Sequence, residues 1–249
     1  MRGLMLHKGA ELVSRENLNQ LPIPAPTTTH HPIGHGDFVS MVEKGIQIEN
    51  MEIADSSFGV TPDGARFFGL LQMAGPNSEF ANVIGLRNSH DKKFPAGLCI
   101  GSSVFVCDNL AFSGQINVTR RHTPKIIRHL PMMVLEATAK MGLAFSNNEK
   151  RINSYKGIDL TKEAAHDLLV ECCENDSVVW SDARKVLKEY REPRHECFKP
   201  ENLFSFWNAV TEVSKGQPLE TLCRRTQSLH ATLDNRAGVK FETIDIETL

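Results

Sequence analysis

Long apolar runs, paired cysteine motifs and aromatic residues are all scarce in this chain of 249 residues. The N-terminal stretch has no apolar run longer than Leu4 to Leu6, and nowhere do about 18 apolar residues follow one another. We therefore expect neither a signal peptide nor a membrane span, and predict a cytoplasmic protein in a bacterial host. The 6 cysteines form no C-x-x-C pair, which argues against a zinc ribbon or a thioredoxin motif.

Sequence motifs for the common nucleotide and hydrolase chemistries are absent as well. The chain has no G-x-x-x-x-G-K-[ST] loop, no G-x-G-x-x-G, no H-E-x-x-H and no G-x-S-x-G. Nucleotide-driven motors, dinucleotide enzymes and common hydrolases are therefore disfavoured, and we predict no cofactor.

The composition is that of a globular domain. Hydrophobic residues make up 41% of the chain, enough to bury a core, and 28 Lys+Arg against 30 Asp+Glu give a formal net charge of −2. This balance creates no overall field that would draw the protein onto nucleic acid or membrane. Any interaction with phosphate must therefore come from a local cluster of charge.

Proline density separates residues 1–35 from the rest of the chain. The stretch Pro22–Pro32 favours extended backbone and forbids a helix, so we expect an arm on the surface or on a neighbouring subunit. The ordered core should begin near Gly36. A first helix should follow, because Phe38, Met41, Val42 and Ile46 share one face at helical spacing.

The sequence pattern of residues 49–120 predicts a curved antiparallel sheet of about five strands. The turn Thr61–Gly64 should join the first two strands, and the remaining apolar runs are separated by Gly and Pro. The expected strands are 49–60, 65–73, 81–87, 98–108 and 115–120, and the apolar segment Val104–Cys107 should lie in the sheet centre.

Helical patterns follow residue 121, so the fold class is α+β. Pro124 suits a first helical position, Pro131 should kink or restart the helix, and the polar stretch Ser146–Ser154 should be a connector. Further helices are expected near 161–174, 177–191, 200–215 and 218–235, with starts signalled by Thr161, Ser177 and Pro200. We divide the chain into an arm (1–35), an α+β core (36–146) and a helical region (147–249).

Two short polar motifs carry a resemblance to a known family. Asn88-Ser-His-Asp91 is followed by Val104-Phe-Val-Cys107-Asp-Asn109 and then by an Arg/His-rich turn into a long helix. This arrangement resembles the phage- and plasmid-encoded family catalogued as domain of unknown function 932, over roughly residues 36–145. The family often has Gly where this chain has Lys92 and Leu110. The resemblance implies a mobile-element context and supplies no settled activity.

The same motifs are one candidate site. Asn88, Ser89, His90, Asp91 and Asn109 could form a polar pocket in which His90 carries protons near neutral pH. These residue types also build turns and strand ends, and antiparallel pairing would place the two motifs at opposite ends of a hairpin. We expect Cys107 to be a buried thiol rather than a nucleophile.

Three histidines could in principle bind a transition metal. His30, His31 and His35 lie within six residues, but a proline-rich arm does not preorganise them and no Cys or carboxylate stands at a matching spacing. We therefore predict no metal site.

A local excess of basic residues is the second candidate site. Between Phe112 and Lys156 there are eight basic residues and two acidic ones. The candidate phosphate ligands, where a strand passes into a helix N-terminus, are Arg120, Arg121, Lys125 and Arg128. Alternation along the strand should send Arg120 and Arg121 to opposite faces, with Arg121 the better ligand. A solvated face balanced by distant acids is the alternative.

Two functions from different classes follow. The favoured one is a mobile-element protein that binds nucleic acid, DNA rather than RNA, in a recombination role; the layout resembles that of ring-forming single-strand annealing proteins. That analogy implies a homo-oligomer. The alternative is a small enzyme or anti-defence factor that uses the polar pocket. Binding is favoured over catalysis.

Overall fold

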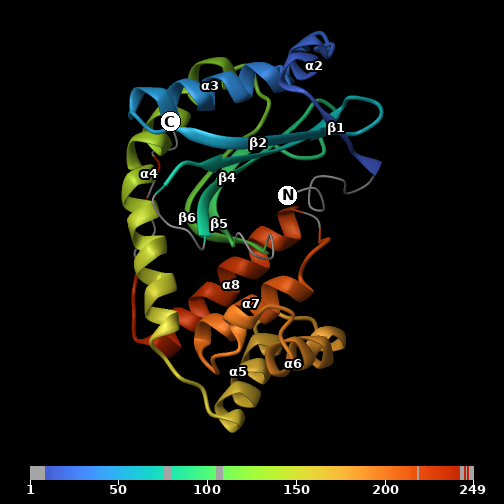
Figure 1. Cartoon of the computed structure of the whole chain (residues 1–249). Coiled ribbons are helices and arrows are strands. Elements are labelled where there is room, and N and C mark those ends of the chain that lie inside the picture. Colours follow the sequence, from blue (N-terminus) through green and yellow to red (C-terminus); the bar gives the residue numbers. More distant parts are fainter. Residues whose placement is uncertain are drawn as a thin grey trace.

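A computed structural model describes residues 9–75, 80–104, 109–217 and 219–241, together with Ile244 and Ile246. Its centre is a strongly curved antiparallel sheet in which the six strands follow one another in sequence order (Figure 1). The strands are β1 (Glu11–Val13), β2 (Ile53–Val60), β3 (Arg66–Met73), β4 (Phe80–Ser89), β5 (Ala96–Val104) and β6 (Asn109–Arg120). The predicted α+β class and the five antiparallel strands between residues 49 and 120 are confirmed.

The turn between β2 and β3 forms as its sequence predicts. Gly64 has a φ of +66°, which glycine adopts without strain, and its N–H donates to the Thr61 carbonyl at 2.7 Å. This turn fixes the register of the hairpin, in which Val60 pairs with Phe67. Strand β6 begins at Asn109 rather than at residue 115, because its first half pairs with β5 before a register shift between Cys99 and Gly101. Residues 105–107, predicted for the sheet centre, lie outside the described residues.

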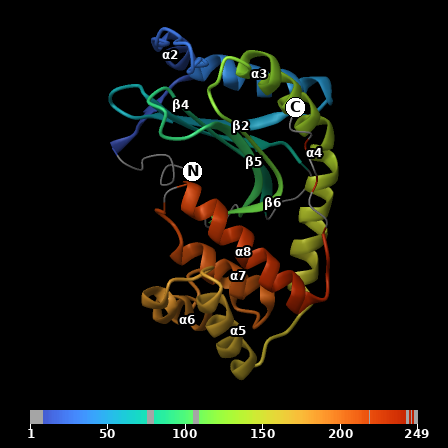
Figure 2. The same ribbon diagram turned by 180° about the vertical axis from the view of Figure 1, so that it is seen from behind.

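Two helices cover one face of the sheet. Helix α3 (His35–Ile48) buries Phe38, Val42 and Ile46, the face that its sequence period predicts. Helix α4 (Ile126–Lys156) begins beside α3 and then runs down to the helical half of the molecule (Figures 1 and 2). Together they close an apolar core over the inward side chains of the strands.

The helices of the C-terminal half lie on the side of the opposite face, which α8 and α7 contact. They are α5 (Lys162–Glu174), α6 (Ala183–Arg191), α7 (Leu203–Val213) and α8 (Leu219–Ala237). Helix α8 contacts the sheet through Leu222 and Cys223, and Figure 1 shows α7, α6 and α5 beneath it. The N-cap of α5 is Thr161, as predicted, whereas α6 begins at Ala183 and not at Ser177.

Two predictions about segment boundaries are wrong. Residues 9–35 are not a detached arm: β1 pairs with the edge strand β2, a short helix α2 (Arg15–Gln20) buries Leu18, and Ile33 is buried in the same core. Residues 22–29, Ile23 among them, are exposed, so the predicted surface position holds for this part of the proline-rich stretch. The polar stretch 146–154 is not a connector either, because α4 continues through Pro131 and across residue 146 without restarting.

Candidate functional site

The side chains of the Asn88–Asp91 motif form hydrogen bonds and an ion pair within the protein, and these contacts fix the backbone. Asn88 donates to the Ile33 carbonyl at 2.8 Å, and the Ser89 hydroxyl donates to the Phe94 carbonyl at 3.0 Å. Asp91 pairs with Arg66 at 2.7 Å. His90 Nε2 lies 2.9 Å from the Ile33 carbonyl oxygen and donates to it. The motif therefore builds the end of β4, which is the turn-forming reading of these residue types.

Four buried histidines gather around this strand end. His35 and His90 stack with their ring centroids 4.0 Å apart, and the ring centroids of His30 and His122 are 5.4 Å apart. Burial, with a contribution from His90, lowers the pKa of His35 to about 3. Burial and the nearby His30 lower the pKa of His122 to about 4. The rings of His35 and His122 are therefore neutral at physiological pH. The contacts of His35 and His90 with Asn88 and Ile33 anchor residues 33–35 to the sheet.

The proposed polar pocket does not assemble. Val104 pairs with both Phe80 and Asn109, whereas Gly97, at the other end of β5, pairs with Arg87, next to Asn88. Asn109 thus lies at the far end of the sheet from the Asn88–Asp91 motif, as the antiparallel argument anticipates. Cys107, Asp108 and the side chain of Asn109 lie outside the described residues.

The four basic residues around the start of α4 differ in exposure: one faces the protein and three face solvent. Arg120 is half-buried and its Nη2 lies 2.6 Å from Nδ1 of His129, so it faces the protein. Arg121, Lys125 and Arg128 are exposed, as alternation predicts for Arg121, and the first turn of α4 holds no acidic residue. Lys125 and Arg128 stand on the α3 side of the sheet, where Ile127 and Lys44 line a shallow hollow. Their binding of phosphate remains a prediction.

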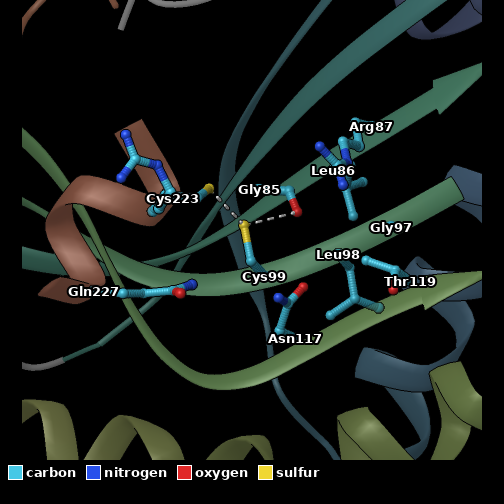
Figure 3. A pocket seen from close by; sticks show the side chains of 11 residues that line it. Gly85, Leu86, Arg87, Gly97, Leu98, Cys99, Asn117, Thr119, Cys223 and Gln227 are labelled. Atoms are coloured by element: carbon cyan, nitrogen blue, oxygen red, sulfur yellow. Dashed lines mark hydrogen bonds between the residues drawn. The ribbon is translucent and has the colours of Figure 1, made fainter. Parts of the chain in front are cut away.

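The sheet face toward α8 carries a pocket that the sequence analysis did not find. Its floor lies on two adjacent cross-strand rows, with Gly85, Cys99 and Asn117 in one and Arg87, Gly97 and Thr119 in the other. Leu70 and Phe68 of β3 continue these two rows beyond the pocket. Helix α8 adds Cys223, Arg224 and Gln227 as a wall around a cavity of about 150 Å³ (Figure 3). The Sγ atoms of Cys99 and Cys223 lie 3.5 Å apart, which joins the sheet to the helix.

The second row stays accessible and combines aromatic and cationic groups. Thr119 is exposed, and Phe68 and Arg87 are half-buried. Beside this row, Asn117 of the first row is exposed and Phe94, in the loop before β5, is half-buried. The rings of Phe68 and Phe94 are 5.5 Å apart, and the Arg87 guanidinium lies 5.7 Å from the Phe94 ring centroid. We call Phe68, Arg87, Phe94, Gly97 and Thr119 the open strip. It offers ring faces and a positive charge on one surface.

Two backbone features shape the open strip. One excludes any side chain at position 97, and the other belongs to a lysine in the loop before β5. A Cβ at Gly97 would lie 2.9 Å from the Val118 carbonyl oxygen, so only glycine fits this floor position. In the loop before β5, Lys92 has a φ of +65°, at the position where the resembled family often has Gly. Lys92 and Lys93 are both exposed next to Phe94.

A second cavity, of about 480 Å³, lies between β6, α4, α8 and the C-terminal segment. Its wall contains a buried polar cluster of Arg151, Tyr155, His230 and Asp234, in which Arg151 binds the Asp234 carboxylate through two nitrogens at 2.8 to 3.0 Å. The Tyr155 hydroxyl donates to Asp234 at 2.7 Å. Sequence reasoning missed this cluster because it placed Arg151 in a connector. Four helical positions separate Arg151 from Tyr155, which is the only local signal.

Comparison with known proteins finds no family model, no curated protein and no solved structure that matches this chain. No helix in the described part of the chain is long and apolar enough to span a membrane. The described histidines, cysteines and acids form no group of three suited to a metal ion. The resemblance to the mobile-element family therefore remains a prediction.

Proposed function

We propose that this protein binds single-stranded nucleic acid along the open strip. The observation that carries the proposal is the row in which Phe68, Arg87, Gly97 and Thr119 pair across four strands. Half-exposed phenyl rings next to a guanidinium suit a strand whose bases are unstacked and whose phosphates are exposed. A duplex would hide its bases from these rings.

The surrounding charge supports the same ligand. Arg224 of α8 lines the pocket beside the strip, and the exposed Lys92 and Lys93 directly precede Phe94. The acid in that loop, Asp91, is already paired with Arg66. In a chain of net charge −2, this surface attracts phosphate locally. Asn117 and Thr119 add neutral polar groups that can bind base or sugar atoms.

Catalysis has less support at this surface. Interaction with Cys223 and burial raise the pKa of the Cys99 thiol, so it is a poor nucleophile. The family resemblance implies a phage or plasmid setting. The analogy with ring-forming annealing proteins suggests a recombination or annealing role on DNA, with several copies of the chain acting together. We keep it as part of the proposal.

The test measures fluorescence anisotropy of labelled 30-mer DNA and RNA oligonucleotides over a range of salt concentrations. Replacing Arg87 and Arg224 by Gln should weaken binding roughly tenfold and lower the salt slope by up to about 1.4 units, at about 0.7 per phosphate contact on a single strand. The matched control replaces Arg184 and Lys188, two exposed cations of α6, by Gln and should leave affinity unchanged.

Three outcomes would overturn the proposal: no binding at low salt, binding that is insensitive to salt, or equal losses in the open-strip variant and the α6 control. Circular dichroism and thermal unfolding establish that each variant is folded. Equal affinity for DNA and RNA would leave the strip in place and overturn only the preference for DNA.

A further inference from the structure

The cavity beside Arg151 contains two buried polar atoms that have no partner among the described residues. These are Nη1 of Arg151 and Nε2 of His230, whose side chains are 3% and 1% exposed. Buried polar atoms are almost always hydrogen-bonded, because desolvation without a partner costs free energy. Both residues line the same cavity of about 480 Å³. Their spare bonding capacity therefore points to a ligand.

The hydrogen bonds of the cluster fix the role of each spare atom. The Tyr155 hydroxyl has one proton, which it donates to Asp234. Its oxygen lies 3.1 Å from Nδ1 of His230, so it accepts a hydrogen bond from the N–H at that position. Burial and the nearby Arg151 lower the pKa of His230 well below its usual value, so the ring is neutral and Nε2 carries a lone pair. Arg151 can only donate. The two spare atoms are thus one donor and one acceptor.

Charge excludes ionic ligands from this pair of atoms. Asp234 already neutralises the Arg151 guanidinium, and the His230 lone pair would repel an anion. A cation would meet the guanidinium and the exposed Lys240 at the rim. The rest of the wall mixes the apolar side chains of Ala231, Val239 and Phe241 with the neutral polar ones of Ser113, Gln115, Gln227 and Asn235. The Phe241 ring lies 4.5 Å from the Arg151 guanidinium carbon. A neutral planar ring suits such a site.

We infer that this cavity binds a neutral lactam heterocycle, the chemistry of uracil, thymine and guanine bases. The ring carbonyl would accept from Arg151 Nη1, and the adjacent ring N–H would donate to His230 Nε2. The cavity volume lies in the usual range for small-ligand sites, about 300 to 1,000 Å³. This site does not depend on the open strip, although Gln227 of α8 lines both cavities.

The experiment titrates the full-length protein with uridine and follows backbone and side-chain N–H signals by NMR. Uridine should shift the signals of residues around Arg151, and 3-methyluridine, which lacks the ring N–H, should bind at least tenfold more weakly. His230→Asn keeps an N–H at the Nδ1 position and removes Nε2, so it should also lose at least tenfold. The Arg87→Gln, Arg224→Gln variant should bind uridine like the unmodified protein.

A second variant keeps the test decisive if His230→Asn does not fold. Phe241→Ala removes a half-buried rim side chain and should weaken uridine binding severalfold without unfolding the chain. The absence of shifts at 10 mM uridine would overturn the inference and assign the spare atoms to water. Equal binding of uridine and 3-methyluridine would overturn it too. Neither result would affect oligonucleotide binding by the open strip.

Discussion

On strand β4, Ile84 and Leu86 point into the core under α3 and α4, whereas Gly85 and Arg87 point toward α8 and line a pocket. The face under α3 and α4 is closed by large apolar side chains. The face toward α8 carries glycines, a guanidinium and half-exposed rings. Because successive side chains of a strand alternate, one sheet can build a stable core and a binding surface at once. Stability and binding should therefore respond to different substitutions along the same strands.

The largest effect is expected from Phe67→Ala. Phe67 is fully buried on the closed face, and truncating a buried phenyl ring costs about 3 to 5 kcal/mol through lost burial and the cavity left behind. Urea unfolding measures this loss as a lower midpoint. A loss below about 1 kcal/mol would contradict the assignment of Phe67 to the core.

Acidification should give the next largest effect, in which two histidines near the end of β4 take a large part. The pKa of His35 is lowered to about 3 and that of His122 to about 4, both by burial first, whereas the unfolded chain titrates near 6.5. The unfolded state therefore binds more protons as the pH falls below 6.5, and stability drops with pH. At pH 5 the loss is about 2 kcal/mol for each of the two residues.

Urea unfolding at pH 7, 6 and 5 measures this slope. The control is His122→Phe, which removes a titrating ring whose nitrogens have no hydrogen-bond partner among the described residues. It should remove about 2 kcal/mol of the loss at pH 5. A profile that is flat in the unmodified chain would show that these histidines are not kept neutral by the fold.

Phe68→Ala tests the open face with the residue next to Phe67. Phe68 is half-buried, so the loss of stability should be well below that of Phe67→Ala. Affinity for a single-stranded oligonucleotide should fall roughly tenfold, because a base stacked on an aromatic ring is worth about 1 to 3 kcal/mol. Anisotropy and urea unfolding on the same samples separate the two effects. A large stability loss with unchanged affinity would move Phe68 into the core.

The smallest effect is expected at the start of α4. Replacing Lys125 and Arg128 by Gln removes two exposed cations on the side of the sheet away from the open strip. Oligonucleotide affinity should change by less than about threefold, a residual effect of general charge screened over a Debye length of about 8 Å. A loss that exceeds the one at Arg87 and Arg224 would instead identify the α4 start as the phosphate-binding surface.

The sequence by itself determined the features that depend on neighbours along the chain. Alternating apolar residues predicted the strands, Gly64 and its turn predicted the first hairpin, and Thr161 predicted the N-cap of α5. The apolar face of α3 follows from its helical period in the same way. Each of these signals acts over a few residues, so it can be read without knowing the fold.

Only the tertiary structure decided which side chains meet. The helix runs through the polar stretch 146–154 because Asn148, Arg151 and Tyr155 are buried against partners from distant segments, with Asp234 83 positions after Arg151. Ile33 joins the core because Asn88 and His90 bind its carbonyl. Local propensity favours a loop or an arm in both segments, and burial of polar groups that find partners only in the folded chain overrides that preference.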